Sequence, residues 1–459
     1  MKKVIIAIVV ILGAIALLPI IGNNISTKIL KERVALLTSN GLELKNETTE
    51  SSYITTKKHY EFLLSDSPKF IQYLSQYSDA QIPPYVNAMI SGAVVGVDIK
   101  YGNFPFTSTL EVDIYPLTLP TTMVDELKEE NINLYNYIDK LLQGKGILYH
   151  INYYTTSELF DGYIKNVNEE YDFDNGSKIS FQLIGATFYG DGALMAPNNL
   201  QTRISKIVIK GDESGKSITF EMNDMIAAST FESQSTYASS AAIKTMLIAV
   251  QEPHKTKIEA TIEDMKVNIS SNTQGEKAEF YTKSSLTKMK INSQDANIIA
   301  SGFNYDISLA GVDKDSYEEF RVLTSQVNAN LTPEYEQKLQ ASIVKLVSKG
   351  LSLNVADLSM DKISIENKEP IDGFNMMAKI VLNEDQDIAN KLKSSPMSLA
   401  NNINLASTIK FSKDFYAIIN KAVPLVGLAN SFAREDGNSL IFEIKLNNGK
   451  LTVNKKAIN

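Results

Sequence analysis

The sequence predicts a β-rich α+β protein, in which a curved antiparallel β-meander is flanked by amphipathic helices and preceded by a single N-terminal transmembrane helix. Three observations lead to this prediction. The chain begins with a long apolar run that carries no charge. From residue 92 on, segment after segment alternates apolar and polar residues, which is the period of a half-buried strand. A few longer segments have the apolar spacing of amphipathic helices instead.

The N-terminal apolar run is Val4–Ile21, eighteen residues without a polar side chain. As a helix it spans about 27 Å, close to the roughly 30 Å of a hydrocarbon core. Lys2 and Lys3 precede it and favour a cytoplasmic N-terminus, so the bulk of the chain is expected on the other side. In a bacterium this predicts a single-pass inner-membrane protein with a periplasmic domain. The anchor side chains are Val4, Ile5, Ile6, Ile8, Val9, Val10, Ile11, Leu12, Ile15, Leu17, Leu18, Ile20 and Ile21.

There are two alternatives to a retained anchor. Ala14-Ile15-Ala16 offers the small-x-small site of a cleaved signal peptide. The apolar run continues past this site, which favours an uncleaved signal-anchor over residues 1–22. A buried core helix is less favourable, because it would lie behind a lysine pair at the extreme N-terminus. The absence of cysteine excludes a lipid-anchored lipoprotein.

The composition limits the class of partner. The formal net charge is −8, and the only arginines are Arg33, Arg203, Arg321 and Arg434. Phosphate and base-edge recognition favour clustered arginine on a basic face, so we expect no nucleic-acid partner. The lack of cysteine also removes disulfides and thiolate metal sites.

Residues 23–91 are predicted to form a helical membrane-exit and connecting region. The stretch Glu47–Lys58 is polar and rich in threonine and serine, which suits a connection. Leu63–Tyr77 is predicted to be a short helix with Phe70 and Leu74 on its apolar side. Pro83 and Pro84 end this region.

Residues 92–312 are predicted to form the antiparallel β-rich domain. Val95–Tyr101 and Leu110–Ile114 alternate as strands do, and Met123–Leu142 interrupts them with a helical pattern. Leu148–Tyr154 resumes the strand pattern. Asn175-Gly176 predicts a two-residue hairpin turn, because both positions favour positive φ.

The strand pattern is nearly continuous from Arg203 to about Gly311. Ile207 and Ile209 are predicted to pair with the strand Ile218–Met222 across a short turn. Within Ile258–Ile269 the parity of the apolar residues changes at Glu263-Asp264. Such a change of phase indicates a bulge or a strand corner.

Residues 313–459 are predicted to form a helix pair and C-terminal strands; whether they continue the preceding domain is left open. Asp315–Val327 is the first helix, and Thr332-Pro333-Glu334 starts the second with a cap and a proline. Its inner face is predicted to comprise Tyr335, Leu339, Ile343, Leu346 and Val347. Asn448-Gly449 predicts a final hairpin.

No motif predicts a catalytic, cofactor-binding or metal-ligating residue. Gly211–Ser217 is one residue shorter than a phosphate loop and leads into a strand, so it is interpreted as a hairpin turn. Asp172–Gly176 and Asp313–Ser316 lack the spacing of a calcium loop. The histidines, His59, His150 and His254, are dispersed in the sequence and are interpreted as surface or strand residues.

The N-terminal anchor, Glu50–Thr56, Ile99–Phe106 and Asn448–Lys456 together resemble the YdgA-like bacterial envelope proteins, the family called domain of unknown function 945. The resemblance extends over nearly the whole chain. It implies an inner-membrane-anchored periplasmic protein without an established enzymatic activity, and it implies no catalytic residue.

Three functional hypotheses follow. The first is a non-enzymatic envelope protein that binds an envelope component or a protein partner. The second is a protein that binds or transfers a lipid or acyl chain in an apolar groove of the curved sheet. The third is a hydrolase whose triad assembles in space; it requires a histidine within hydrogen-bonding reach of both an acid and a serine or threonine.

Overall fold

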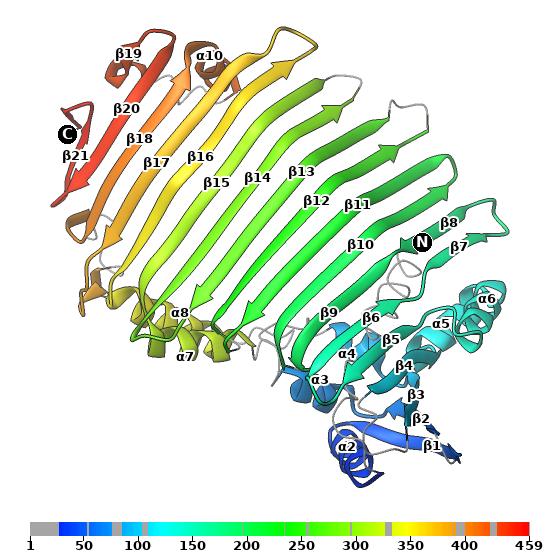
Figure 1. The fold of residues 1–459 in the computed structure, drawn as a ribbon. Coiled ribbons are helices and arrows are strands. Elements are labelled where there is room, and N and C mark those ends of the chain that lie inside the picture. Colours follow the sequence, from blue (N-terminus) through cyan, green and yellow to red (C-terminus); the bar gives the residue numbers. More distant parts are fainter. Residues whose placement is uncertain are drawn as a thin grey trace. The chain divides into compact units, whose positions relative to one another are not determined.

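The protein divides into two compact units, here called unit 1 and unit 2. Figure 1 labels the helices and strands of both. The computed structural model describes residues 27–52, 55–75, 85–102, 109–194, 196–233, 235–253, 257–293, 296–325, 333–388, 390–391, 400–422 and 429–458. Unit 1 comprises residues 1–234 and 250–253, and unit 2 comprises residues 235–249 and 254–459. The division does not fall at residue 312, so the predicted helix pair belongs to the same unit as the strands that precede it.

Both units consist of antiparallel strands with helices packed on them, so the predicted β-rich α+β class is confirmed. The predicted anchor Val4–Ile21, with Lys2 and Lys3, lies outside the described residues. Among the residues that the structure does describe, no helix combines the length and the apolar character needed to cross a bilayer.

Unit 1 contains one antiparallel sheet and two groups of helices. The register gives the order β1-β2-β3-β4-β5-β6-β9-β10-β11, and the β7–β8 hairpin extends the sheet by pairing with the second half of β10. Its helices are α2 (Thr27–Ser39), α3 (Ser67–Ser75), α4 (Tyr85–Ile90), α5 (Thr121–Glu130) and α6 (Ile132–Gln143). Its strands are β1 (Leu42–Ser51), β2 (Thr55–Leu64), β3 (Val94–Gly102), β4 (Thr109–Thr118), β5 (Tyr149–Tyr154), β6 (Leu159–Ile164), β7 (Val167–Asp172), β8 (Lys178–Ile184), β9 (Ala186–Ala193), β10 (Ala196–Glu213) and β11 (Lys216–Phe231).

The core of unit 1 lies on one face of this sheet. In β2 to β6 every second side chain is buried, and the largest of these include Tyr60, Phe62, Ile99 and Tyr153. Helices α2, α3 and α4 add aliphatic and aromatic side chains to the same cluster. The alternate residues of the same strands are polar and more exposed, as the period of two requires.

The sequence placed several elements of unit 1 inaccurately. The polar stretch Glu47–Lys58 forms most of the β1–β2 hairpin, because its alternate residues lie on the polar face of the sheet. The helix predicted over Leu63–Tyr77 is α3, which starts only at Ser67 because Asp66 accepts a hydrogen bond from the Lys69 amide and caps it.

Two local features explain the remaining differences in unit 1. The helix predicted over Met123–Leu142 is two helices, because Asn131 is extended (φ −158°) and its side chain caps α6 through the Leu134 amide. At the Asn175-Gly176 hairpin only Gly176 has positive φ, while the Asn175 side chain accepts from the Ser177 amide. The Gly211–Ser217 turn is confirmed, since Ser214 and Gly215 both have positive φ and β11 follows.

Within unit 2 the antiparallel strands follow the order β13-β14-β15-β16-β17-β18-β20-β21-β22 in the register, with β19 also paired to β20. Its helices are α7 (Lys314–Ser325), α8 (Pro333–Ser348) and α10 (Lys413–Ala422). Its strands are β12 (Tyr237–Gln251, for the most part), β13 (Ile258–Asn272), β14 (Lys277–Asn292), β15 (Asn297–Asp313), β16 (Leu351–Ile365), β17 (Ile371–Leu382), β18 (Ile403–Ser412), β19 (Arg434–Asp436), β20 (Ser439–Asn447), β21 (Lys450–Val453) and β22 (Lys456–Ile458).

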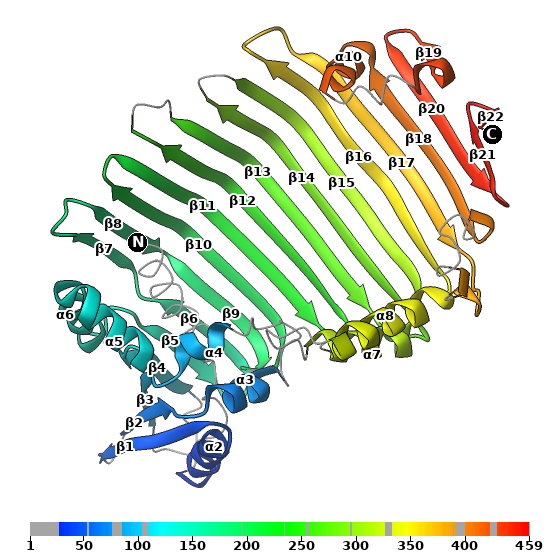
Figure 2. The ribbon, with the colours of Figure 1, turned by 180° about the vertical axis from the view of Figure 1, so that it is seen from behind.

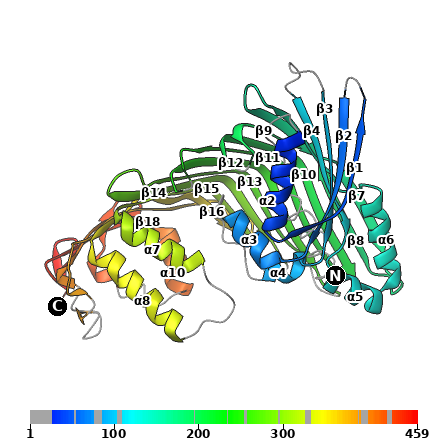
Figure 3. The ribbon, with the colours of Figure 1, turned by 90° about the horizontal axis from the view of Figure 1, so that it is seen from below.

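One face of the unit 2 sheet is apolar from strand to strand. A single row of directly paired residues runs Phe280, Leu309, Leu353, Ile380, Leu405, Leu446 and Leu451. Tyr317 of α7 packs on Phe280, and Phe415 of α10 stacks on Phe374, so both helices lie on this apolar face (Figure 3). Helices α7 and α8 lie side by side at one end of the strands (Figure 2).

The face of α8 differs from the prediction at one position. Ile343 is 44% exposed, while Ser342 is buried beside the half-buried Leu339 and Leu346. The helix therefore presents Ser342, not Ile343, to its neighbours. Pro333 begins the helix as predicted, and Gly350, with a φ of +75°, follows its last residue Ser348 by two positions.

A line of left-handed residues crosses the strands of unit 2. Asp264 in β13 and Gly302 in β15 have φ of +52° and +63°, and pairing with β14 is interrupted at both while the register on either side is unchanged. Ala300 and Phe303, three residues apart, pack in the same apolar cluster, so the side chains change face at Gly302. The change of phase predicted at Glu263-Asp264 is therefore present, produced by backbone handedness without an inserted residue. We call this line the crease.

We expect Asp264→Ala to lower the free energy of unfolding by about 1 kcal/mol, because a Cβ-bearing residue other than Asn or Asp is strained at positive φ. Asp264→Gly should cause no loss of this free energy. Urea unfolding of the full chain in detergent micelles, followed by circular dichroism, measures this. Lys266→Ala, two residues along the same strand, is the control and should change little. Equal stabilities of the alanine and glycine variants would contradict the strain.

Candidate functional site

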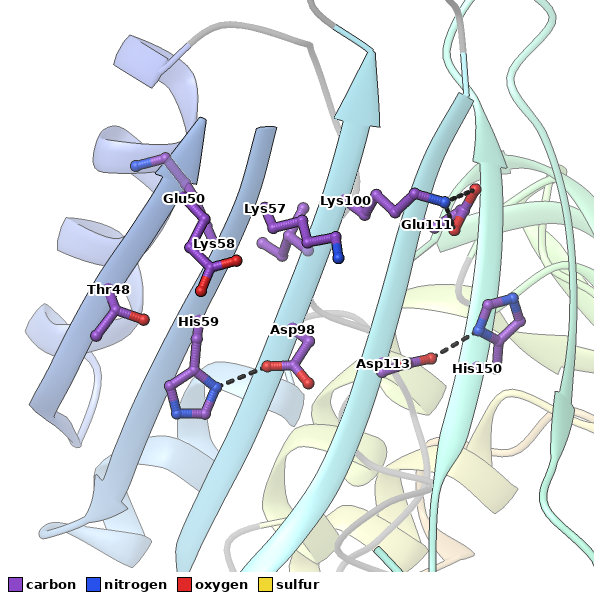
Figure 4. Close-up of a pocket in the computed structure, with 11 residues that line it drawn as sticks. Thr48, Glu50, Lys57, Lys58, His59, Asp98, Lys100, Glu111, Asp113 and His150 are labelled. Atoms are coloured by element: carbon purple, nitrogen blue, oxygen red, sulfur yellow. Dashed lines mark hydrogen bonds and ion pairs between the residues drawn. The ribbon is translucent and has the colours of Figure 1, made fainter. Parts of the chain in front are cut away.

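A row of polar side chains crosses the exposed face of the unit 1 sheet. Its members are directly paired in the register of neighbouring strands, from β1 to β10. We call this row the polar ladder; it consists of Thr48, His59, Asp98, Asp113, His150, Tyr163, Thr187 and Arg203. Figure 4 shows its central part, where two aspartates lie between two histidines.

Asp98 is the most heavily bonded residue of the polar ladder. One carboxylate oxygen contacts His59 Nδ1 at 2.6 Å, and the other accepts from the Tyr115 hydroxyl at 3.0 Å and from the Lys145 ammonium. The second ring nitrogen of His59 lies 3.2 Å from Glu61. His59 is thus held between two carboxylates, and Asp98 among three donors.

Gly96 makes room for Tyr115 in this cluster. An added Cβ at Gly96 would lie 2.5 Å from the Tyr115 ring, so the ring crosses β3 at a residue without a side chain. The Lys145 ammonium lies 4.1 Å from the centroid of the same ring, where cation–π attraction adds to its ion pair with Asp98.

The second half of the polar ladder repeats the arrangement more simply. Asp113 lies 2.6 Å from His150 Nδ1, and the other ring nitrogen of His150 lies 3.2 Å from Asn152. The Tyr163 ring stacks on the imidazole with centroids 4.8 Å apart. Asp98 and Asp113 are directly opposed in the register, so two carboxyl groups are neighbours, and each is hydrogen-bonded to its own histidine.

The surroundings shift the pKa values of the His59 cluster. Burial lowers the pKa of His59, but hydrogen bonds with Asp98 and Glu61 outweigh burial and hold the pKa above its usual value. Burial likewise raises the pKa of Asp98, and the bonds from Lys145 and His59 reverse this and hold it below its usual value. Burial and the Asp98 carboxylate raise the pKa of the Tyr115 hydroxyl. The cluster therefore favours a positively charged His59 beside an ionised Asp98.

A cavity of about 380 Å³ lies over the polar ladder and the next row of the same face. That row pairs Glu50 with Lys57, Lys57 with Lys100, and Lys100 with Glu111. Lys100 forms an ion pair with Glu111, whereas Lys57 forms none with a described residue. One side of the cavity thus carries both lysines and glutamates, and the other side carries the carboxylates of Asp98 and Asp113 (Figure 4).

The geometry of the described residues bears on two kinds of site, a hydrolase triad and a metal site. Neither His59 nor His150 makes a hydrogen bond to a serine or threonine of the described chain, so the condition for a hydrolase triad is not met there. No group of three histidine or acidic side chains within those residues is arranged to hold a metal ion. Asp313, from one of the two segments compared with a calcium loop, caps α7 by accepting a hydrogen bond from the Ser316 amide.

Comparison with protein-family models, curated proteins and solved structures finds no match to this chain. The resemblance to the YdgA-like envelope proteins is thus unsupported by these comparisons and stays a prediction.

The interpretation of the histidines as isolated strand residues missed the polar ladder. His59 and His150 are 91 positions apart, yet the register places them three strands apart in one row. His254 lies outside the described residues. A partial signal was present: each of β3 to β5 carries an ionisable residue between two large apolar ones, whereas His59 of β2 lies between Lys58 and Tyr60. Only the register shows that the four positions align.

We expect the coupling between His59 and Asp98 to depend on pH. Because the folded pKa of His59 is raised, its contribution to stability is fully present below the unfolded value of about 6.5 and is lost as pH rises through the folded value. A double-mutant cycle of His59→Gln and Asp98→Asn, measured by urea unfolding, should give a larger coupling energy at about pH 5.5 than at about pH 9. A coupling that is equal at both values, or larger at the higher one, would contradict the charged pair.

We expect Gly96→Ala to destabilise unit 1 by about 1–3 kcal/mol, because the added methyl displaces the Tyr115 ring and its bond to Asp98. The matched control is the same substitution in a Tyr115→Ala background, where the ring is absent and the loss should be smaller. Thermal unfolding of the four proteins measures both. Equal losses in the two backgrounds would place the strain elsewhere than at Tyr115.

Proposed function

We propose that the chain is a non-enzymatic binding protein, tethered to the bacterial inner membrane by Val4–Ile21, whose unit 1 binds an envelope component or a partner protein in the periplasm. The observation that supports binding is the polar ladder under its cavity, where acids, histidines and lysines are fixed by mutual hydrogen bonds on an exposed sheet face. Side chains already held in place lose little conformational entropy when a ligand binds.

The chemistry of the site favours recognition over reaction. A general base needs an acceptor nitrogen or oxygen within reach of a substrate proton. Both ring nitrogens of His59 already contact carboxylates, and both of His150 contact Asp113 or Asn152. The imidazoles therefore hold and orient the aspartates through hydrogen bonds, which suits a surface that presents fixed polar groups to a ligand.

The second candidate, binding of a lipid or acyl chain, is favoured by the apolar face of unit 2. Between α7 and α10 the paired residues Tyr305, Leu358, Met376 and Ile409 are only half-buried. Half-buried apolar rows of this length can accept a hydrocarbon chain. The cavity over the polar ladder lies in unit 1, and the cavity that Ser342 lines lies among residues of α7 and α8, so neither supports this candidate.

The first candidate predicts a crosslink from the polar ladder. A photoreactive amino acid in place of Glu111, beside the cavity, should give a covalent product with an envelope component in intact bacteria. The matched control is the same substitution at Glu366, in an exposed turn of unit 2, which should give none. Products of equal yield from both positions, or none from Glu111, would contradict the proposal.

The second candidate predicts bound lipid. The full chain, purified in detergent, should retain a hydrocarbon-bearing molecule detectable by mass spectrometry of an organic extract. Met376→Asp, on the apolar face, should reduce its amount several-fold, whereas Asn375→Asp, on the other face of the same strand, should not. Absence of lipid under several extraction conditions would eliminate this candidate.

A further inference from the structure

Around Tyr163, the member of the polar ladder on β6, the exposed face of unit 1 carries large side chains that a solvated sheet face does not need. Tyr189 is 56% exposed, Leu159 49% and Tyr163 44%, and all three lie on the adjacent strands β6 and β9. Tyr154 of β5 is directly opposite Leu159. We call Tyr154, Leu159, Tyr163 and Tyr189 the tyrosine patch. Clustered exposed apolar surface of this kind is typical of a binding site.

The rings of the tyrosine patch are held in place. The Tyr154 hydroxyl donates to Asp161 at 2.8 Å, and the Tyr189 hydroxyl donates to Gln201. Tyr163 is stacked on His150. A tyrosine fixed in this way offers contact area at a low entropic cost, as the rigid aromatic residues of recognition surfaces do.

Acids and amides surround the rings. Asp161, directly opposite Tyr189, accepts from Asn152 at 3.0 Å and from Tyr154, and Asp191 accepts from Asn199 at 2.8 Å. A carboxylate has about four acceptor sites, so Asp161 and Asp191 keep acceptor capacity for hydroxyl donors. The patch thus combines flat apolar surface with fixed acceptors.

These features select among classes of ligand. The carboxylates Asp161 and Asp191 disfavour the phosphates of nucleic acids. The backbone of β6 is paired on both sides, with β5 and β9, so a peptide cannot add to it as a strand. A sugar ring presents an apolar C–H face and a rim of hydroxyl donors, which matches aromatic rings bordered by carboxylates and amides.

We infer that the tyrosine patch binds a saccharide chain; this rests on the proposed function and names the envelope component as a glycan. The ligand is a chain because the patch continues, through Asn152 and Glu111, into the row beside the cavity. A polymer that lies across the strands follows one such row and meets the side chain of the next strand about every 4.8 Å. Unit 1 therefore supplies stacking at the patch and polar contacts along the rows.

The test titrates the full chain in detergent micelles with a chito-oligosaccharide and a cello-oligosaccharide by isothermal calorimetry. Binding of at least one is expected, and Tyr189→Ala should weaken it about five- to tenfold, the effect of one aromatic contact. Tyr189→Phe keeps the ring and should retain most of the affinity. If Tyr189→Ala fails to fold, Tyr163→Ala gives the same comparison.

Tyr281→Ala is the matched control, because Tyr281 also lies on a strand and donates to an acid, Asp306, but belongs to unit 2. It should leave binding unchanged. Three results would overturn the inference: no binding of either saccharide, an equal loss of affinity in Tyr281→Ala, or binding of tetramethylammonium in place of the saccharides. Tetramethylammonium stands for the quaternary ammonium ligands that aromatic side chains also bind. A protein crosslinked at Glu111 without saccharide binding would overturn the inference alone and leave the proposed function intact.

Discussion

The register of β2 to β5 is the constraint on which unit 1 depends. Successive side chains of a strand face opposite ways, so a slip by one residue would exchange His59 and Asp98 with the buried Tyr60 and Ile99. Fully burying one such apolar side chain contributes about 1.5–3 kcal/mol. An exposed ion pair contributes at most about 1 kcal/mol. The core therefore fixes the register, and the polar ladder takes its alignment from the core.

The alignment has a cost that the polar ladder itself offsets. Directly opposed like charges destabilise a strand pair, and Asp98 faces Asp113. His59 and Lys145 on one side and His150 on the other supply the opposite charge or the hydrogen bonds. A purely structural sheet face would avoid the two aspartates more simply, since threonine or asparagine would fill the same positions without repulsion. Their presence is consistent with a surface that meets a ligand.

Local sequence signals predicted most of the fold. The pairing of Ile207 with Met222 and of Ile209 with Phe220 follows from alternation and turn chemistry, and so does the Asn448-Gly449 hairpin, where both residues have positive φ. The errors have equally local causes. Asn131 divides a helical pattern because an asparagine cap competes with helix continuation, and Ser342 faces inward because helix packing overrides side-chain polarity.

The candidate site was beyond sequence reasoning for a different reason. The residues of the polar ladder extend over 155 positions of the sequence, from Thr48 to Arg203. No spacing rule connects His59 with Asp98 or Asp113 with His150. Only the paired registers bring them into one row. The hairpin β1–β2 was missed in the same way, because its polar face resembles a connection until the partner strand is known.

The crease determines which side chains of unit 2 lie on each face of the sheet. Hydrogen-bond pairing is the same on both sides of Asp264 and Gly302, yet the side chains turn over there. Moving the left-handed residue one position along a strand would leave almost every ladder bond intact and still reverse the facing of one side chain. A few backbone dihedrals therefore carry information that the pairing pattern does not, and two sheets with identical registers can have differently composed surfaces.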